Sequence, residues 1–203
     1  MSIGSLEQKI GIEVYLTSTA GIEGKLRCLI GDFRVEEIPN IDPGGKGDFL
    51  VVELTKHNWE MHLAIKSIAR SMGIGYRRIG FAGTKDRKAV TRQLISIWNM
   101  DEAILDKVKL DGIQLRALGK LERPIVLGDL KGNRFDIIIR DIDLDPDVLN
   151  SRARLNTDEL LGSGGAPNFY GVQRFGTRRP ITGDVGEAIL KGDLEKAALI
   201  YIA

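Results

Sequence analysis

The sequence predicts an α+β fold in which a mixed, largely antiparallel sheet is flanked by helices. Two observations lead to this fold class. Segments rich in β-branched residues occur in hairpin-like pairs, and segments with apolar residues at helical spacing lie between some of these pairs. The regular strand-helix-strand alternation of a parallel sheet is not evident in the pattern, nor is a repeat of solenoid length.

The first hundred residues contain most of the expected strands. A short helix fits residues 5–16, and a second helix fits residues 59–72, with Asn58 as its expected cap and Gly73 at its end. Strands are expected at 25–30 and 33–38, as two strands or one bulged strand around Gly31-Asp32, and at 49–56, 78–82 and 90–98.

The second half alternates less regularly. A helix is expected at 101–108, followed by a strand at 113–118. The next strand, 135–139, should follow a turn at Lys131-Gly132. Helices are expected at 145–161 and 185–202, and the glycine-rich aromatic segment GSGGAPNFYGVQRFG separates them.

Composition bounds the classes of protein that the chain can belong to. Its 203 residues permit one large domain or two small ones, and 43% hydrophobic with 28% charged residues is typical of a soluble globular protein. No apolar run approaches the roughly 20 residues of a membrane span, and the N-terminus lacks a basic stretch followed by an apolar core, so we expect a cytoplasmic protein with no membrane partner. Because the net charge is +1, a nucleic-acid surface would have to be local.

The cysteine and histidine residues do not indicate a metal site. Cys28 is the only cysteine, which rules out an intrachain disulfide and makes a cysteine-based zinc site implausible. We expect it to fill space in a strand. His57 and His62 lie five residues apart, whereas the metal-binding HExxH pattern places its histidines four apart on one helical face.

One polar turn concentrates charge around a single carboxylate. In Gly83-Thr84-Lys85-Asp86-Arg87-Lys88, three cations surround Asp86, which favours its ionised form and suits phosphate contact. A solvated charged turn is the plainer interpretation. The segment lacks the GxxxxGK[S/T] pattern of a phosphate-binding loop, and a GTPase base-recognition element would need an acid at Arg87.

Two further segments suit an unpaired nucleotide. NFYGVQRFG, residues 168–176, interleaves aromatics with Asn168, Gln173 and Arg174, and Arg178 and Arg179 extend its charge. The alternative is an aromatic loop packed on the core. Gly132-Asn133-Arg134-Phe135 reads as a turn that enters a strand, and taken alone it is more often a plain hairpin corner.

In order and in wording these segments resemble the TruD family of pseudouridine synthases. FAGTKDRKAVTRQ is similar to the family's most diagnostic stretch, which implies Asp86 as the catalytic residue. GNRF is similar to its Gly-Asn-x-Phe element and implies Asn133 and Phe135 at the active site, with Phe135 stacking near the target base. NFYGVQRFG resembles the Asn-x-x-Gly-x-Gln-Arg-Phe-Gly signature, and DFRVEEIP resembles the N-terminal Asp-Phe-x-Val-x-Glu strand.

The resemblance spans residues 26–176 and has two departures. Leu29-Ile30-Gly31 stands where the family usually has Pro-Glu before Asp-Phe. The family also uses a basic residue upstream of that strand, for which Arg27 is the nearest candidate. Members continue further, through an inserted TruD-specific domain and back to the catalytic sheet, so residues 1–203 are expected to be the first half of the pseudouridine synthase catalytic domain, ending at or near the insertion. The missing C-terminal part would then be a partner.

The resemblance implies isomerisation of uridine to pseudouridine in transfer RNA, at position 13, without a cofactor. Asp86 would act either as a nucleophile at the sugar or as the base that starts elimination, and the residues leave both routes open. The expected substrate contacts are Lys85, Arg87, Lys88 and Arg174 for phosphate or charge, Phe135 for stacking, and Asn133, Asn168, Gln173 and Arg27. The rival interpretations are a non-catalytic RNA-binding module and a nucleotide or small-molecule enzyme, although the latter lacks a phosphate-binding strand-loop-helix motif.

Overall fold

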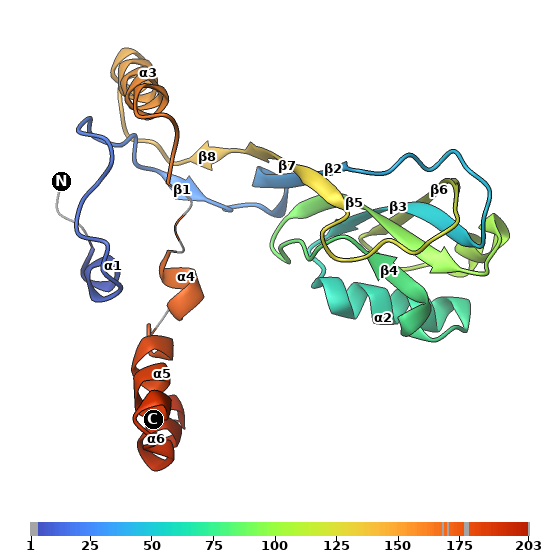
Figure 1. Cartoon of the computed structure of the whole chain (residues 1–203). Coiled ribbons are helices and arrows are strands. Elements are labelled where there is room, and N and C mark those ends of the chain that lie inside the picture. The colour runs from blue at the N-terminus through green and yellow to red at the C-terminus, as the bar shows by residue number, and fades with distance from the viewer. Residues whose placement is uncertain (1–3, 168, 170, 177–178, 203) are drawn as a thin grey trace. The chain divides into compact units, whose positions relative to one another are not determined.

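The computed structural model describes residues 4–167, 169, 171–176 and 179–202 (Figure 1). By its internal contacts the chain divides into two compact units, one formed by Gly24–Ile142 and the other by Met1–Glu23 together with Asp143–Ala203. Each unit is described by itself. In the described part of the chain, no helix combines the length and the apolar character needed to cross a membrane.

The unit of residues 24–142 is built on a mixed sheet. Within its described residues, the sheet order is β6-β3-β5-β2-β7, with β4 paired to β5, and β1 and β8 form a separate two-stranded ribbon. Every pairing is antiparallel except that of β2 with β5, as a largely antiparallel α+β fold requires. The strands are β1 Lys25–Leu26, β2 Phe33–Pro39, β3 Phe49–His57, β4 Ile79–Phe81, β5 Val90–Trp98, β6 Ile113–Leu121, β7 Leu130–Ile137 and β8 Ile139–Arg140.

One long helix covers a face of this sheet. Helix α2, Met61–Met72, starts at Glu60, whose carboxylate accepts hydrogen bonds from the amides of His62 and Leu63, and ends at Gly73 with a left-handed φ of 72°. Its apolar stripe packs on alternate residues of β3 and β5, which point to the same face. The main buried side chains are Leu50, Val52, Leu54, Ile95 and Ile97 of the sheet and Ala64, Ile65 and Ile68 of the helix.

Strand β2 separates its residues strictly by face. Phe33, Val35 and Glu37 are buried on one face, whereas Arg34 and Glu36 lie on the other, as the period of two in a strand requires. The register pairs Val35 with Phe135 and Glu37 with Asn133 of β7. These two β7 residues therefore share the face of β2 that carries the buried side chains.

Short 3-10 turns connect several elements of this unit. They are η1 Ile30–Asp32, η2 Tyr76–Arg78 and η3 Glu102–Lys107. The last one replaces the α-helix expected at 101–108. The predicted strand pair around Gly31 is two separate strands, β1 and β2, with η1 between them.

The unit of residues 1–23 and 143–203 is helical. Its helices are α1 Ser5–Lys9, α3 Pro146–Gly162, α4 Val172–Phe175, α5 Thr182–Leu190 and α6 Leu194–Ile202. Glu159 of α3 binds the N-terminal segment, because its carboxylate accepts from the amides of Ser18, at 2.5 Å, and Thr19, at 3.1 Å. The Thr19 hydroxyl, which also donates to this carboxylate, and then the Ser18 amide hold the pKa of Glu159 below its usual value. Helices α5 and α6 pack together through the buried Ala188 and Ala197.

Glycines explain three corrections to the expected elements. The first helix ends at Lys9 rather than near residue 16, just before Gly11 at φ 83°. The helix expected at 185–202 is two helices, because Gly192 takes φ 76° and Asp193 caps α6 through the amide of Lys196. The turn expected at Lys131-Gly132 lies instead at Gly128, φ 97°, and β7 already begins at Leu130.

Two single-residue expectations were also wrong. Asn58 does not cap α2: it takes the left-handed φ of 61°, and Glu60 caps the helix two residues later. Cys28 does not fill space in a strand. It is exposed between β1 and η1, with its thiol 3.8 Å from the carbonyl oxygen of Lys25.

Candidate active site

The charged turn at 83–88 connects β4 to β5 and places Asp86 against Arg27. Arg27 Nη2 donates a hydrogen bond of 2.7 Å to Asp86 Oδ2. The side chains are 31% and 41% exposed, so the pair is anchored in the protein and still reachable by a ligand. Arg27 takes a left-handed φ of 56°, a rare conformation for a non-glycine residue. The family resemblance indicated Arg27 and Asp86, and the structure brings these two side chains into contact.

Two phenylalanines continue the site from Arg27. The guanidinium carbon of Arg27 lies 3.8 Å from the ring centroid of Phe33, which is a cation–π contact. Phe33 meets Phe135 edge to face, with centroids 6.0 Å apart and ring planes at 71°. Because Phe135 is 55% exposed, its ring is available to stack on a planar ligand. Asp86, Arg27, Phe33 and Phe135 therefore form a continuous row of contacts.

Asn133 lies on the same face of β7 as Phe135, two residues earlier along the strand. Both are in the strand itself, which corrects the expectation that GNRF is a turn. The exposed amide of Asn133 can reach the edge of a ligand that stacks on Phe135.

A buried lysine holds the backbone of the turn. Lys56 of β3 is fully buried, and its ammonium donates to the carbonyl oxygens of Trp59, Lys85 and Asp86 at 2.8, 3.2 and 2.7 Å. Burial lowers the pKa of Lys56 to about 8, although the nearby Asp86 and Glu60 carboxylates oppose the shift. Sequence analysis did not identify it. The available signal was its place after Leu50, Val52 and Leu54 on the inward face of the strand.

Side chains of β2 and β5 also hold the turn in place. Lys85 Nζ forms an ion pair of 2.7 Å with Glu37 Oε2, and the two side chains are 5% and 1% exposed. Glu37 Oε1 also accepts from the amide of Leu94 at 3.2 Å, and Gln93 Nε2 donates to the carbonyl oxygen of Gly83 at 2.9 Å. Lys85 therefore has a buried internal partner, which corrects its expected role as a phosphate contact. Glu37 is a second residue that the sequence patterns did not single out.

The segment that carries Arg27 is fixed at its far end. The Asp32 carboxylate accepts from the amide of Leu29 at 2.7 Å and from Arg140 Nε and Nη2 at 2.9 and 2.7 Å. The Arg140 hydrogen bonds, with help from the Leu29 amide, hold the pKa of Asp32 below its usual value. This pair anchors η1 to β8 and so restricts where Arg27 can lie. Sequence analysis did not foresee it.

The remaining expected contacts differ in position. Arg87 and Lys88 are exposed on the turn, beside Asp86, and available to phosphate. Gln173 and Arg174 lie in α4, in the other unit. Asn168 lies outside the described residues.

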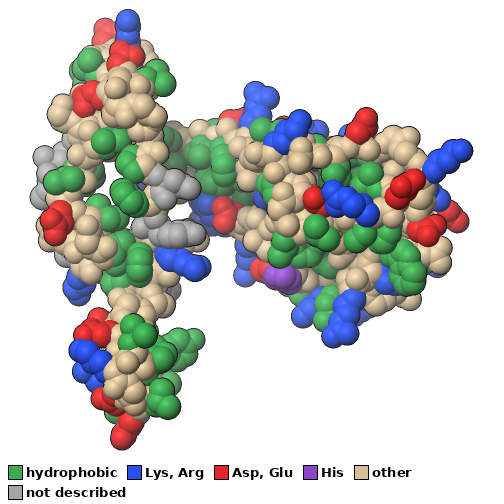
Figure 2. Space-filling model, in the orientation of Figure 1, with side chains coloured by type: hydrophobic (Ala, Val, Ile, Leu, Met, Phe, Trp, Pro, Cys, Tyr) green, Lys and Arg blue, Asp and Glu red, His purple; other side chains and the backbone are tan. Residues whose placement is uncertain are grey.

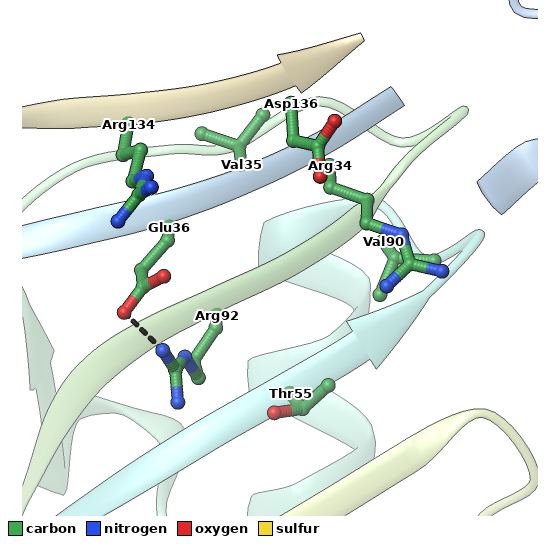
Figure 3. Close-up of a pocket in the computed structure, with 8 residues that line it drawn as sticks. All are labelled: Arg34, Val35, Glu36, Thr55, Val90, Arg92, Arg134 and Asp136. Carbon is green, nitrogen blue, oxygen red and sulfur yellow. Dashed lines mark hydrogen bonds and ion pairs between the residues drawn. The ribbon is translucent and has the colours of Figure 1, made fainter. Parts of the chain in front are cut away.

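A separate hollow lies on the opposite face of β2 (Figure 3). It measures about 340 Å³ and is lined by Arg34, Val35, Glu36, Thr55, Val90, Arg92, Arg134 and Asp136. Within this lining, Arg92 forms an ion pair with Glu36, as the dashed line shows, and also lies 3.7 Å from Glu53. Carboxylates thus offset much of its positive charge. Since Asp86 is not in its lining, we place the candidate chemistry at the Arg27–Asp86 pair.

Comparisons with known proteins identify the family of the chain. The family model described as tRNA pseudouridine synthase D (TruD) matches residues 9–203. A relative from Methanococcoides burtonii, named "Probable tRNA pseudouridine synthase D", is 50% identical over 202 residues, which cover all of this chain and 46% of the relative. The relative of that name from Methanosarcina mazei is 45% identical, with the same coverage of both chains.

A solved structure matches the fold. The crystal structure of a Methanosarcina mazei protein that carries the tRNA pseudouridine synthase D (TruD) name aligns with a TM-score of 0.89 at 45% identity, over all of this chain and 46% of that one. This match confirms the α+β fold class. The chain spans about half the length of the curated relatives it matches. On the family model and these identities together, the chain belongs to the TruD family of tRNA pseudouridine synthases.

Proposed function

We propose that this chain supplies the catalytic carboxylate, Asp86, of an enzyme that converts uridine to pseudouridine in transfer RNA. The observation that carries the proposal is the contact of Arg27 with both Asp86 and Phe33 beside the exposed ring of Phe135. A reachable carboxylate, held by a cation and bordered by an aromatic ring, suits a nucleobase that has left its stack.

The proposed reaction is an isomerisation. The bond between ribose C1′ and uracil N1 breaks, the base turns, and a bond forms between C1′ and C5. N1 gains a proton and C5 loses one, so the atoms balance without an oxidant, a reductant or an energy donor. Asp86 acts either by attacking C1′, to form an ester that the turned base displaces, or by removing a ribose proton to start elimination. In both routes the carboxylate is regenerated.

The surrounding residues have distinct tasks in this proposal. Arg27 orients the Asp86 carboxylate, and Phe135 stacks on the extruded base while Asn133 contacts its edge. Arg87 and Lys88 contact phosphates next to the target nucleotide. Gln173, Arg174 and Asn168 are kept as proposed substrate contacts on the strength of their sequence motif alone. Lys85 and Lys56 act inside the protein and hold the turn.

The curated relatives are about twice as long as this chain. We propose the remaining part of the protein as a partner that completes the substrate site, with tRNA position 13 as the target and the cytoplasm as the place of action. No cofactor is needed for the proposed isomerisation.

Release of tritium from C5-tritiated uridine in transfer RNA tests the proposal directly. The assay compares the complete gene product with this chain, and each with its Asp86→Asn variant. We expect the complete product to release tritium and Asp86→Asn to bind RNA without releasing it. Appreciable turnover by Asp86→Asn would remove Asp86 from the reaction, and RNA binding without product from any form would favour a non-catalytic RNA-binding module.

A further inference from the structure

The surface formed by α2 and η2 is strongly cationic, unlike the chain as a whole. The whole sequence balances 29 lysines and arginines against 28 acids, yet residues 61–84 contain Lys66, Arg70, Arg77 and Arg78 and no Asp or Glu. Lys66, Arg70 and Arg77 are exposed, and none of the four takes part in an ion pair among the described residues. Figure 2 shows Lys and Arg side chains projecting where α2 lies in Figure 1. This uncompensated charge suits a polyanion.

Two hollows lie side by side on this surface and share His62 and Phe81. The first measures about 590 Å³, and its lining includes Thr84 and Leu127 besides the shared pair. The second measures about 260 Å³ and is lined in part by Lys66, Tyr76 and Arg77. The His62 and Phe81 rings, which line both hollows, meet edge to face with their centroids 5.9 Å apart. Mostly apolar linings that contain aromatic rings suit stacked bases.

Aromatic and cationic side chains alternate at the second, smaller hollow. Tyr76 is 49% exposed, and Lys66 Nζ lies 5.8 Å from the centroid of its ring. The alternation of stacking surface with ammonium and guanidinium groups is typical of sites for single-stranded nucleic acid, where bases stack and the backbone follows the charge.

The larger hollow extends to the turn that carries Asp86. Thr84, in its lining, is two residues before Asp86 on the same turn. A nucleotide strand that places one base at Asp86 can therefore continue past Thr84 onto His62 and Phe81.

We propose that the α2–η2 surface, defined as His62, Lys66, Tyr76, Arg77, Phe81 and Thr84, binds the single-stranded nucleotides that adjoin the target uridine. Their bases lie in the two hollows, and Lys66 and Arg77 contact their phosphates. The inference rests on the proposed function, because it takes RNA as the substrate. The unbalanced positive charge and the half-exposed tyrosine favour RNA over a protein partner as the occupant.

The charge component is tested by RNA binding at several salt concentrations. The double variant Lys66→Ala/Arg77→Ala is compared with Lys46→Ala/Lys107→Ala, which removes the same charge from exposed positions that are not among the residues of the α2–η2 surface. Because each phosphate contact to a single strand contributes about 0.7 to the slope of log affinity against log salt, we expect the first variant to lower the slope by about 1.4. The control should keep the wild-type slope. Equal slopes in both variants overturn the proposal and leave a solvated face or a protein-binding face.

The stacking component is tested with Tyr76→Ala and Tyr76→Phe. Loss of one stacked base should weaken RNA binding about 5- to 150-fold in Tyr76→Ala, and Tyr76→Phe should restore it. The loss should disappear when the RNA carries abasic nucleotides beside the target uridine. A loss that is the same with and without those bases overturns the stacking assignment, and thermal unfolding verifies that each variant is folded.

Failure of this inference is distinguishable from failure of the proposed function. All binding measurements are repeated in the complete gene product carrying Asp86→Asn, in which turnover plays no part. Turnover by Asp86→Asn would reject the catalytic assignment whatever the slopes are. Wild-type slopes in Lys66→Ala/Arg77→Ala would reject the α2–η2 surface even if Asp86 proves essential.

Discussion

Arg27 Nη2 lies 2.7 Å from Asp86 Oδ2, although 59 positions of chain separate the two residues. The same guanidinium stacks on Phe33 and so connects the carboxylate to the aromatic part of the site. One edge of the guanidinium binds Asp86 and its face covers Phe33, and two such contacts fix its position better than either alone, which makes Arg27 the residue that aligns Asp86 with Phe135.

Replacing Arg27 should therefore reduce turnover more than RNA binding. For Arg27→Ala we expect a fall in kcat of about 100-fold, because a displaced catalytic group can reduce a rate by that factor. Arg27→Lys should recover much of the loss, since it keeps the charge at Asp86. Tritium release measures both variants, and wild-type kcat in Arg27→Ala would show that Asp86 needs no such partner.

The buried ion pair of Lys85 and Glu37 predicts a large effect on stability. Glu37→Gln leaves the Lys85 charge buried without its counter-ion and should lower the free energy of unfolding by about 3–5 kcal/mol. Glu36→Gln is the matched control, since its exposed partner Arg92 is on the other face of the strand and such pairs contribute about 0–1 kcal/mol.

Urea unfolding of these variants measures the difference. The double variant Glu37→Gln/Lys85→Met should recover most of the stability, because it removes both charges from the interior. Equal losses in Glu37→Gln and Glu36→Gln would contradict the burial that distinguishes the two glutamates.

Lys56 should make stability depend on alkaline pH. Its pKa in the folded protein is about 8, below the ordinary 10.5 that it regains on unfolding. Between these values the unfolded chain binds more protons, so the free energy of unfolding contributed by this group rises with pH. Urea unfolding at pH 7 and pH 10 should show the rise in the wild type, and Lys56→Met should lack it.

The same titration should affect turnover in the opposite direction. A neutral Lys56 has two hydrogens for three carbonyl acceptors, so the hold on the backbone of Asp86 weakens. We expect kcat to fall as pH rises through about 8. A kcat that stays constant up to pH 9 would show that the charge of Lys56 is not needed to align the turn.

Asp32 should contribute to acid sensitivity. The hydrogen bonds from Arg140 and Leu29 lower its pKa below the ordinary 3.8, so the folded state binds fewer protons than the unfolded state in acid. The stabilisation is complete above about 3.8 and is lost as the pH falls through the folded value. Unfolding followed from pH 6 to pH 2 should show a shallower acid loss in Asp32→Asn than in the wild type.

The sequence predicted the hydrophobic strands and α2 well because periodicity determines them. The expected strand at 90–98 is β5 with the same bounds, and α2 ends at Gly73 as the glycine indicated. The sequence did not predict which short turns are 3-10 or where the β7 turn falls, because those depend on single backbone conformations such as that of Gly128.

In the candidate site, too, some residues could be predicted from the sequence and others could not. Family motifs indicated Asp86, Arg27 and Phe135, which the structure brings into one row of contacts. Lys56 and Glu37 were missed because their roles depend on tertiary contacts with a turn from another part of the chain. A charged residue on the inward face of an otherwise apolar strand was the one local sign.

The pairing of β2 with β5 also has a bearing on biosynthesis. β2, which follows the segment that carries Arg27, pairs with β5 and with β7, and both of these strands come later in the chain. Asp86 lies on the short connection between β4 and β5. At translation rates of about 5–20 residues per second, Arg27 precedes Asp86 from the ribosome by about 3–12 s. During synthesis Arg27 and β2 therefore remain unpaired until β5 is made, and the row of contacts is complete only after β7, which carries Phe135, has followed.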